Sequence, residues 1–587
     1  MAGTAADLNG GTKAMKALRN GLSALLSLAL VTGPLSAAAP QPEIAKNGMI
    51  VSAHRHANAA GLDVLKRGGN AVDAAIAVAY ALAVTFPEAG NIGGGGFMTV
   101  RMADGRTTFI DFRETAPAAA TPTMFQDARG NLIPEKSTRG HLSVGVPGTV
   151  AGLELALAKF GTRRRAELMA PAIALASKGF VLDAGDAMFL AEGAVDFAKD
   201  APSAAIFLNK GQPWKAGERL VQADLGRTLS AIARGGNAAF YTGPLASRIA
   251  AANRAGGGVM TAADFARYKA VERKPIECDY RGYHVISAPP PSSGGVVLCE
   301  TLNVLEGYDI AAMGWHSSSA VHVTTEALRR AYRDRNLNLG DPDFVPVDTN
   351  RFTSKAYAQT LRAGISMDKA TPSASLMAPG AGKEGQSTTH FSVVDKAGNA
   401  VSLTYTLNDW FGARVTAAGT GILLNDEMDD FAAKPGQPNM YGLIEGPNNA
   451  VAPGKRPLSS MTPTIVTRDG KLFLVLGTPG GSHIPTGVLQ VMVNVIDHKM
   501  GLTDAVNVPR IHAQWMPDVL YHERDALSAD TRAALAAKGH RLEEMPYWNQ
   551  IAAILVGAPG LGAKPIDNAA LYGANDPRLP TGGALGY

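Results

Sequence analysis

One stretch of this chain, from about residue 371 to residue 412, constrains the fold more than any other. A loose segment, TPSASLMAPGAGKEGQS, ends abruptly at Thr388, where the alternating pattern TTHFSVVDKAGNAVSLTYTLN begins. Its two arms, 388–395 and 399–407, are rich in Val, Thr, Tyr and Phe, and Lys-Ala-Gly lies between them. The pattern predicts a β-hairpin with a short loop that contains glycine.

The first residue of that hairpin, Thr388, is a candidate for self-cleavage. A hairpin centred on Ala397 places Thr388 opposite Thr406, where cross-strand side chains meet, so the Thr406 hydroxyl can orient that of Thr388. A cut after Ser387 would give Thr388 both a hydroxyl nucleophile and a free amine as its base. The alternative is two threonines of high strand propensity on a solvated face, and periodicity alone favours it.

The bulk composition is that of a globular protein. The chain has 587 residues, 46% hydrophobic and 18% charged, which suits one large domain or several smaller ones. Its 65 glycines and 35 prolines indicate many turns and a loop-rich α/β protein. The net charge is only +4 and no basic stripe stands out, which argues against a nucleic-acid partner.

The N-terminal segment departs from this composition. Lys13, Lys16 and Arg19 precede the apolar run GLSALLSLALVTG, and the small residues SAA follow. Residues 1–38 therefore resemble a secretory signal peptide. A short amphipathic helix or a membrane anchor is the alternative, but neither this run nor any later stretch is long enough to span a bilayer comfortably. We expect cleavage near residues 37–39 and a periplasmic or secreted protein without a stable membrane anchor.

Residues 47–100 have the pattern of a first αβ unit. Helices are expected at 59–67 and from Asn70 to about residue 85, with Asn70 as the N-cap of the second. Four glycines at 93–96 then precede strands around 97–101 and 107–112. Phosphate binding is a weak interpretation of these glycines because no Lys-Ser/Thr follows them. Close backbone packing in a core sheet explains them better.

The rest of the chain alternates between helical and extended patterns. The region 140–370 is predicted to be mainly helical, and the segment 371–387 is the clearest boundary. After the hairpin, strands are expected at 421–424, 464–467 and 471–476, followed by a helix at 485–498. This order fits sheets covered by helices.

The two cysteines, Cys278 and Cys299, lack the spacing of metal ligands. Export would permit a disulfide between them. Two buried free thiols fit the sequence equally well, because a free cysteine behaves as a small apolar residue. Their state stays open at this point.

Three groups of residues after the hairpin offer complementary chemistry. An acidic cluster at 426–430 is typical of a solvated loop, but two of its carboxylates can hold a substrate ammonium. Two adjacent serines add hydroxyl donors. Two consecutive glycines after a strand form either a simple turn or an oxyanion hole of bare backbone N–H groups. The residues concerned are Glu427, Asp430, Ser459, Ser460, Gly480 and Gly481.

Taken together, nine stretches resemble the γ-glutamyltranspeptidase family of the N-terminal-nucleophile hydrolase superfamily. They follow the family's order along nearly the whole chain and are highly specific as a set. The resemblance implies an α/β (α+β) fold, a four-layer αββα sandwich built from two subunits cut from one precursor. The large subunit would span 39–387 and the small subunit 388–587, forming a heterodimer. The stretches are GNIGGGGFM, DFRETAP, PPPSSGG, LGDPDF, the hairpin itself, GILLNDEMDDF, RPLSSMTPTIV, GTPGGSHI and YGANDPR.

The resemblance also implies a role for each site residue. The guanidinium fork of Arg113 would pair with the α-carboxylate of a γ-glutamyl group, assisted by two serines. Three polar residues would hold the α-ammonium, and Tyr441 would gate the site from a lid loop at 434–456. The implied catalytic residues are Thr388, Thr406, Gly480 and Gly481; the substrate-binding residues are Arg113, Asn408, Glu427, Asp430, Tyr441, Ser459 and Ser460; and autocleavage involves Ser387 and Thr388.

The implied activity is cleavage of γ-glutamyl amides such as glutathione through a γ-glutamyl ester of Thr388. The glutamyl group would pass to water or to an amino acid or dipeptide, without a metal or organic cofactor. The nearest alternative is a glutaryl or cephalosporin acylase of the same superfamily. Its substrates lack the α-ammonium that Glu427 and Asp430 would meet, and such relatives often lack the lid loop. A catalytically silent binding protein would need a defect at a site residue, and the sequence has none.

Overall fold

The predicted hairpin lies at the centre of the structure. β12 (Thr389–Asp395) pairs antiparallel with β13 (Ala400–Thr406), and Thr389 lies opposite Tyr405, which is the register expected from the sequence. The Asp395 carboxylate accepts the backbone N–H groups of Ala397 and Asn399, and Gly398 has a φ of 86°. A glycine tolerates this left-handed conformation without strain, so the turn fixes the register of both strands.

The computed structural model describes residues 41–376, 388–557 and 570–587. The expected signal peptide, most of the expected linker and Ser387 lie outside the described residues. The residues from Pro42 to Tyr587 form one compact unit. No helix in the described part of the chain is long and apolar enough to cross a lipid bilayer.

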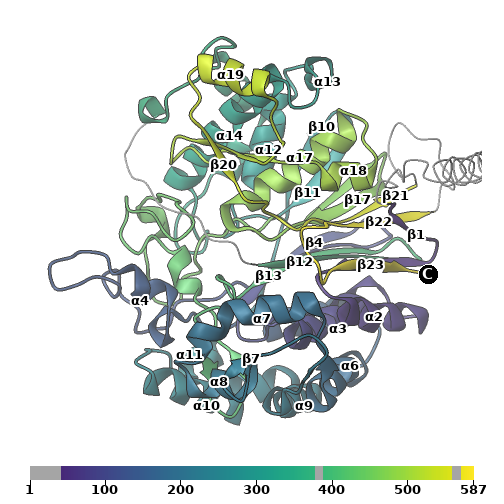
Figure 1. Cartoon of the computed structure of the whole chain (residues 1–587), viewed down its shortest axis with the longest axis vertical. Helices are drawn as coiled ribbons and strands as arrows, with labels where there is room; N and C mark the ends of the chain where they lie inside the picture. Colours follow the sequence, from purple (N-terminus) through teal and green to yellow (C-terminus); the bar gives the residue numbers. More distant parts are fainter. Residues whose placement is uncertain (1–40, 377–387, 558–569) are drawn as a thin grey trace, which may run out of the picture. The chain divides into compact units, whose positions relative to one another are not determined.

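Two seven-stranded antiparallel sheets form the middle of this unit (Figure 1). Sheet I has the order β1 (Glu43–Ala45), β22 (Leu571–Asn575), β21 (Ala552–Val556), β17 (Lys471–Gly477), β16 (Thr464–Arg468), β11 (Tyr283–Ser287) and β10 (Ile276–Tyr280). Sheet II has the order β23 (Gly583–Gly586), β2 (Gly48–Ser52), β12, β13, β3 (Gly95–Arg101), β4 (Thr107–Asp111) and β9 (Val271–Arg273).

The sheets pack face to face through apolar side chains. Val394 of β12 meets Val475 of β17 and Ile554 of β21 in one buried cluster. The Ser392 hydroxyl also donates to the Ala552 carbonyl, 3.0 Å away in the other sheet. Both faces of β12 are buried, so the strand has no solvent-facing row, and its polar side chains are buried as well.

A helix layer covers the outer face of each sheet. Sheet I carries α12 (Gly294–Leu305), α14 (Ser318–Asn338), α17 (Ile484–Ile496) and α18 (Leu502–Asn507). Sheet II carries α2 (Arg55–Lys66), α3 (Ala71–Thr85), α5 (Thr149–Phe160), α6 (Arg165–Lys178) and α9 (Ala223–Asn237). Figure 1 shows the two helix layers on opposite sides of the sheets. This is the αββα arrangement that the sequence resemblance implied.

α3 shows why the sequence folds this way locally. Its residues are Ala-rich and apolar all round, and every one is buried, as expected for a helix inside a layer. The Asn70 side chain accepts the Asp73 N–H, and the Asp73 carboxylate accepts the Asn70 N–H. This reciprocal cap starts the helix at the predicted position.

The glycine run before β3 is explained by close packing. A Cβ on Gly95 would lie 2.5 Å from the Phe112 carbonyl oxygen, and one on Gly96 would lie 2.4 Å from the Thr404 carbonyl oxygen. Only glycine lets these backbones approach, as the sequence interpretation expected.

The region 140–370 is mainly helical, as predicted, but it also includes strands that the sequence did not predict. It contains β9, β10 and β11, which extend both sheets. β10 has the sequence IECDY and alternates buried with exposed residues, so the missed strand did carry a period of two. The strand is short, lies between predicted helices, and has charged residues on its exposed face, so its period of two was not recognised in the sequence.

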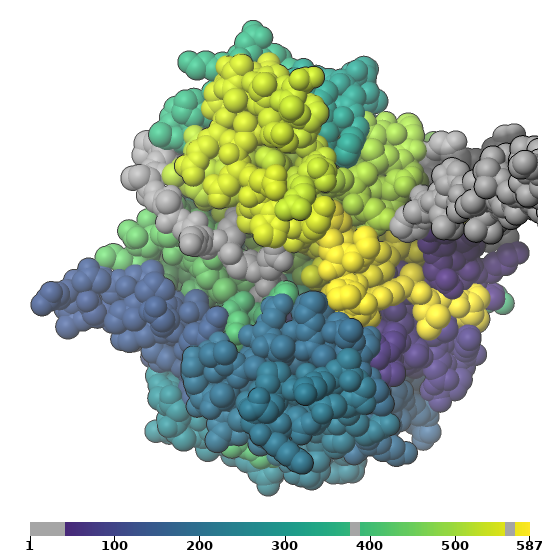
Figure 2. Space-filling model, in the orientation of Figure 1, coloured from purple at the N-terminus to yellow at the C-terminus, as the bar shows by residue number. Residues whose placement is uncertain are grey.

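Segments far apart in the chain meet over the helices of sheet I. Figure 2 shows residues of the 310–370 range and residues of the 500–550 range side by side on the surface. The Lys538 ammonium donates to the Met367 carbonyl, and His316 Nδ1 lies 2.8 Å from the Ala526 carbonyl oxygen.

The structure joins Cys278 of β10 to Cys299 of α12 as a disulfide across 21 residues. Closing a loop of this length restricts the unfolded chain and stabilises a fold by about 3 kcal/mol. We expect the Cys278→Ser/Cys299→Ser variant to lose about that much unfolding free energy, measured by urea denaturation. Its activity at 25 °C should match that of the parent, because neither cysteine lines the site described below. An unchanged urea midpoint, or a free thiol in the denatured parent, would contradict the bond.

Candidate active site

Thr388 immediately precedes β12, and Thr406 is the last residue of β13. The Thr388 hydroxyl donates to Thr406 Oγ1 at 3.2 Å, so the structure contains the hydrogen bond expected from the hairpin register. Thr406 Oγ1 also accepts the Asn408 N–H at 2.9 Å, which fixes the Thr406 hydroxyl oxygen. Both threonines are buried. The Thr388 hydroxyl is therefore held in one orientation at the edge of a cavity.

The backbone of Thr388 is strained. Its φ is 134°, a conformation that a β-branched residue rarely adopts. Such conformations cost about 1–3 kcal/mol and persist only where the surrounding structure enforces them. The strain lies beside the peptide bond that joins Thr388 to Ser387.

Most of the predicted site residues line one cavity around Thr388. They come from the central hairpin of sheet II, from the loop after β4, from the loops after β13 and before β16, and from the turn after β17. The cavity volume is only about 20 Å³, because the side chains of the site nearly fill it. Its lining includes Arg113, Thr388, Thr406, Asn408, Glu427, Asp430, Tyr441, Ser459, Ser460 and Gly481, all predicted, and Arg335, Leu443, Met461 and Ile484, which were not. Gly480 is adjacent but does not line the cavity.

Arg113 is the main cation of this cavity, and it already has anionic partners. Its guanidinium forms ion pairs with the carboxylates of Glu427 and Asp430. Nε of Arg113 also donates to the Pro457 carbonyl at 3.2 Å, and Asp111 accepts its backbone N–H at 2.9 Å. Sequence reasoning assigned these charges to opposite ends of a substrate, whereas the structure shows them paired with each other.

Burial controls the protonation of the acids near Arg113. It raises the pKa of Glu114 to about 7 and that of Glu427 well above its ordinary range, although the Arg113 charge opposes both shifts. The pKa of Arg113 is raised by the carboxylates of Glu427 and Asp430 despite burial, which acts in the other direction. The guanidinium therefore stays charged, and protons are retained among the surrounding carboxyl groups at neutral pH.

Glu427 and Asp430 lie in a short 3₁₀ helix, η4 (Glu427–Asp430). Asn425 anchors its start, because its amide nitrogen donates to the carbonyls of Gly93 and Gly145 while its amide oxygen accepts the Glu427 N–H. No hydrogen-bond donor among the described residues reaches Glu427 Oε2, which is buried. Glu114, whose carboxyl group interacts with that of Glu427, is the neighbour with which it can share a proton.

Tyr441 covers the cavity from the loop 434–456. Its hydroxyl lies 2.9 Å from both the carbonyl and the side-chain oxygens of Asn408. Its ring lies against Gly481, where a Cβ would come within 2.5 Å of Tyr441 Cδ1. Glu445 of the same loop forms a buried ion pair with Arg335, which joins the loop to α14.

Arg335 was missed by the sequence analysis. It is buried, donates from Nε to Ser293 Oγ at 3.0 Å, and approaches Ser460 Oγ at 3.4 Å. Arg335 is one of four arginines on α14, and no local sequence signal distinguishes it from the others. Its place in the site depends on how that helix packs.

His390 is the histidine that follows Thr388 on β12, and it is not a base for it. Its Nδ1 lies 2.8 Å from Thr404 Oγ1 and its Nε2 lies 3.1 Å from Ser392 Oγ. Burial lowers the pKa of His390 to about 3. Among the described residues, the Thr388 hydroxyl has its hydrogen bond to Thr406 and none to an ionisable side chain. A base for Thr388 therefore has to come from elsewhere.

One cluster in the described ranges has the composition of a metal site. It contains His322, Glu326 and His540 and shares no residue with the Thr388 cavity. The Glu326 carboxylate already accepts hydrogen bonds from Arg329, Arg330 and Thr371.

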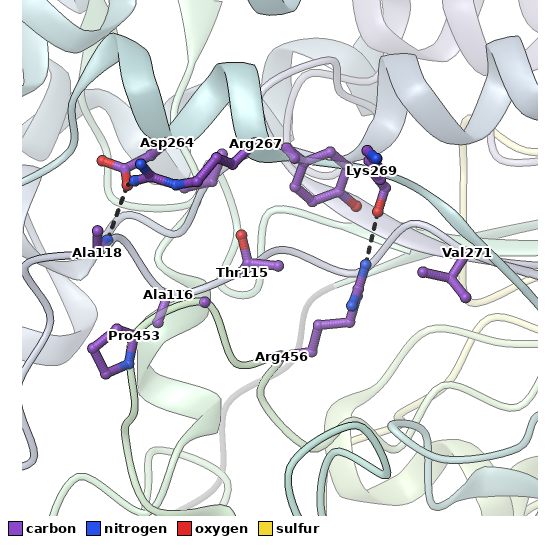
Figure 3. Close-up of a pocket in the computed structure, with 12 residues that line it drawn as sticks. Thr115, Ala116, Ala118, Asp264, Arg267, Lys269, Val271, Pro453 and Arg456 are labelled. Carbon is purple, nitrogen blue, oxygen red and sulfur yellow. Dashed lines mark hydrogen bonds and ion pairs between the residues drawn. The ribbon is translucent and has the colours of Figure 1, made fainter.

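A larger cavity lies behind Arg113. Its volume is about 370 Å³, and Figure 3 shows Arg456 donating to the Lys269 carbonyl and Asp264 accepting the Ala118 N–H at its walls. The Tyr268 hydroxyl donates from this side to the Arg113 carbonyl at 2.8 Å. The cavity contains no predicted site residue, so we assign the chemistry to the small cavity at Thr388 in spite of its size.

Two antiparallel sheets between helix layers, with a threonine at the start of a central strand, are the arrangement of an N-terminal-nucleophile hydrolase. The family model for gamma-glutamyltranspeptidase matches residues 57–586. A glutathione hydrolase proenzyme of Pseudomonas sp. (strain A14) is 57% identical over 567 residues, which are 96% of this chain and 98% of the relative. Another, from Escherichia coli (strain K12), is 50% identical over 549 residues and 93% of each chain. The chain belongs to the γ-glutamyltranspeptidase family.

A solved structure agrees with this fold. The crystal structure of cephalosporin acylase from Bacillus halodurans matches with a TM-score of 0.80 and 28% sequence identity, and covers 95% of this chain and 99% of its own. The two glutathione hydrolase proenzymes are much more similar in sequence than this acylase.

Proposed function

We propose that the protein is a self-processing γ-glutamyltranspeptidase and glutathione hydrolase with Thr388 as its nucleophile. The observation that carries this proposal is the oriented Thr388 hydroxyl in a cavity that also contains one buried arginine and two buried acids. A γ-glutamyl group ends in an α-carboxylate and an α-ammonium, which are complementary to those charges. The proenzyme relatives support both the processing and the substrate class.

Processing begins in the precursor. The Thr388 hydroxyl attacks the Ser387 carbonyl carbon, the C–N bond between the two residues breaks, and Ser387 is held as an ester on Thr388 Oγ1. The hydroxyl proton passes to the departing nitrogen, which becomes the Thr388 amine. Water then hydrolyses the ester, which releases Ser387 as a carboxylate and restores the Thr388 hydroxyl. The strained φ of Thr388 favours this step, because cleavage releases the backbone from its constraint. The products are a segment 39–387 and a segment 388–587, which form the proposed heterodimer.

The freed amine then acts as the base of the mature enzyme. An α-amino group has a pKa of roughly 8, so a useful fraction is unprotonated near neutral pH. It takes the proton of the Thr388 hydroxyl as that oxygen attacks the γ-carbonyl carbon of glutathione. Cysteinylglycine leaves with a proton, and the γ-glutamyl ester of Thr388 forms. Water, an amino acid or a dipeptide then takes the glutamyl group and restores the hydroxyl.

Substrate binding exchanges one set of ion pairs for another. Arg113 releases its acids and forms a bidentate pair with the α-carboxylate, to which Ser459 and Ser460 donate hydrogen bonds. The released acids, Glu427 and Asp430, hold the α-ammonium. Every buried charge keeps an opposite partner during this exchange, which avoids the penalty of an unpaired buried ion.

The remaining predicted residues complete the site. Asn408 contacts the α-ammonium, and Tyr441 closes the cavity from the loop 434–456. The N–H groups of Gly480 and Gly481 bind the oxyanion, a contribution worth about 100- to 1000-fold in rate for each donor. The small volume of the cavity means that Arg113 and Tyr441 have to shift before a glutamyl group enters. We also propose export of the protein after removal of residues 1–38.

The acylase relatives define the competing substrate class. A glutaryl group has the terminal carboxylate but no α-ammonium. Its carboxylate would form an ion pair with Arg113, and Glu427 and Asp430 would then have no cationic partner. We expect kcat/KM for a γ-glutamyl anilide to exceed that for the matching glutaryl anilide by at least about 1000-fold, from an uncompensated buried charge worth roughly 4 kcal/mol. Both reactions release the same chromophore and are followed by its absorbance. Equal or reversed preference would assign the protein to the acylases.

A further inference from the structure

We propose that Asn549 is a positioning residue that orients the oxyanion-binding turn at Gly480 and Gly481. This inference rests on the proposed function and adds a residue from a distant part of the chain. Asn549 precedes β21, is buried, and does not line the Thr388 cavity. It acts on the reaction only through the turn that it contacts.

The contact is made by the side-chain amide. Asn549 Nδ2 donates to the Pro479 carbonyl oxygen at 2.6 Å, and the Thr478 hydroxyl donates to the same oxygen at 2.9 Å. A carbonyl oxygen only accepts hydrogen bonds, so the amide nitrogen, and not the amide oxygen, has to face it. The Pro479 carbonyl therefore accepts hydrogen bonds from two side chains.

The orientation of this carbonyl determines the orientation of the next N–H group. The peptide between Pro479 and Gly480 is planar and trans, so its N–H points away from its C=O. With the oxygen held toward Asn549, the Gly480 N–H is directed to the opposite side of the turn. The next residue, Gly481, lines the cavity together with Thr388, and a Cβ on Gly481 would face Tyr441 and not Asn549. The Gly480 N–H makes no hydrogen bond with any residue that the structure describes.

The turn depends on outside support because its own backbone is unusual. Gly480 has a φ of 128° and Gly481 a φ of 54°, which glycine adopts readily but which leave the peptide planes free to rotate. Asn549 removes that freedom by filling the space behind the turn. A Cβ on Gly480 would lie 2.5 Å from Asn549 Nδ2, and one on Gly487 in α17 would lie 2.6 Å from Asn549 Oδ1.

Asn549 is itself held rigidly. The preceding Trp548 N–H donates to Glu523 at 3.0 Å, and the following Gln550 N–H donates to Thr478 Oγ1 at 2.9 Å. Glu523 is fixed in turn by an ion pair with Arg578. Asn549 has a φ of 61°, which asparagine, aspartate and glycine tolerate better than other residues. The chain thus presents one amide at a fixed position behind the turn.

The test is the Asn549→Asp variant, assayed with a γ-glutamyl anilide across a range of pH. The variant keeps the size and backbone preference of asparagine but donates to Pro479 only when its carboxyl group is protonated. We expect kcat to fall about 10- to 100-fold at alkaline pH, less than loss of a complete oxyanion donor. The loss should shrink as the pH falls and the carboxyl gains its proton, while KM stays within about twofold. The wild-type protein has the same ionisable neighbours, Glu523, Asp576 and His483. Any pH dependence of kcat that these groups cause is therefore present in the wild-type profile, to which the profile of the variant is compared.

A matched control separates positioning from general stability. Asn253 in α10 (Pro244–Ala255) is also buried, donates to the His141 carbonyl at 2.7 Å, and packs against Gly258. Asn253→Asp should lower the thermal midpoint without changing kcat or its pH profile. Asn549→Gly, which keeps the backbone conformation but has no donor, should show the reduced kcat at every pH. If the Asn549→Asp precursor is not cleaved, the kcat of Asn549→Gly tests the positioning role instead.

The outcomes are distinct. If wild type does not cleave the γ-glutamyl anilide, the proposed function fails and this inference with it. If wild type is active and Asn549→Asp retains wild-type kcat at all pH values, the positioning role alone is wrong. A reduced kcat in Asn549→Asp with the same pH profile as wild type also overturns it, because a merely structural defect would not follow the carboxyl proton.

Discussion

Replacing Thr388 by alanine is expected to leave one uncut chain with no measurable γ-glutamyl transfer. The variant loses the hydroxyl that cuts the precursor, and without the cut no free amine forms. Loss of the nucleophile in a comparable hydrolase lowers kcat roughly 10⁶-fold. Nearby His390 does not replace the hydroxyl, because its two ring nitrogens lie within hydrogen-bond distance of the Thr404 and Ser392 hydroxyls.

Denaturing electrophoresis and intact-mass analysis measure the processing, and anilide release measures the activity. Thr388→Ser keeps a hydroxyl and should still be cut. Thr389→Val is the matched control, because Thr389 Oγ1 is buried without a hydrogen-bond partner among the described residues, and its loss should leave both readouts within a few-fold of the parent. An uncut Thr388→Ala chain with full activity, or a small fragment that begins elsewhere, would rule out Thr388.

Replacing Arg113 by methionine should affect both activity and stability. The substrate carboxylate would lose two charge-assisted hydrogen bonds worth about 1.5–3 kcal/mol each, which lowers kcat/KM by roughly 10²- to 10⁴-fold, mainly through KM. Glu427 and Asp430 would also remain buried without their cation, and removal of one partner of a buried pair costs about 3–5 kcal/mol.

Steady-state kinetics and urea denaturation separate these two effects. Arg113→Lys should recover part of the stability, because it keeps the charge, but little of the affinity, because an ammonium lacks the planar fork. Arg330→Met is the control: Arg330 is buried against Glu326, away from the cavity. It should lose stability while each folded molecule keeps its activity. An unchanged KM for Arg113→Met would remove this residue from the carboxylate site.

The central hairpin could be predicted from sequence because its information is local. A period of two and a glycine-containing turn fix which residues face each other, and Thr389 does lie opposite Tyr405. The short strands β21, β22 and β23 were not predicted. β21 and β22 pair with each other and also with β17 and β1, and β23 pairs with the distant β2. β23 contains only the sequence GALG, which has no alternating pattern of its own. Tertiary pairing, not local preference, makes it a strand.

The family resemblance predicted which residues form the site. It did not predict which of these residues form ion pairs with each other. Arg113 and Glu427 are separated by 314 positions, so nothing local indicates that they form an ion pair. The sequence analysis predicted that these two residues bind opposite ends of a substrate. It made no prediction for the site in the absence of substrate. Arg335 was missed for the same reason, since only the packing of α14 selects it from neighbouring arginines.

The order of strands in the two sheets has a final consequence. β12 lies between β2 and β13, and β23 pairs with the other edge of β2, so segments from before and after Thr388 alternate across sheet II. A cut at Thr388, as proposed, would leave two pieces that share both sheets and the helix layer over sheet I, without the continuous chain that brought them together. The proposed mature heterodimer would then keep a fold that was assembled while the chain was continuous. Its lifetime would depend on the barrier to unfolding, because two separated pieces lack the connection that first brought them together.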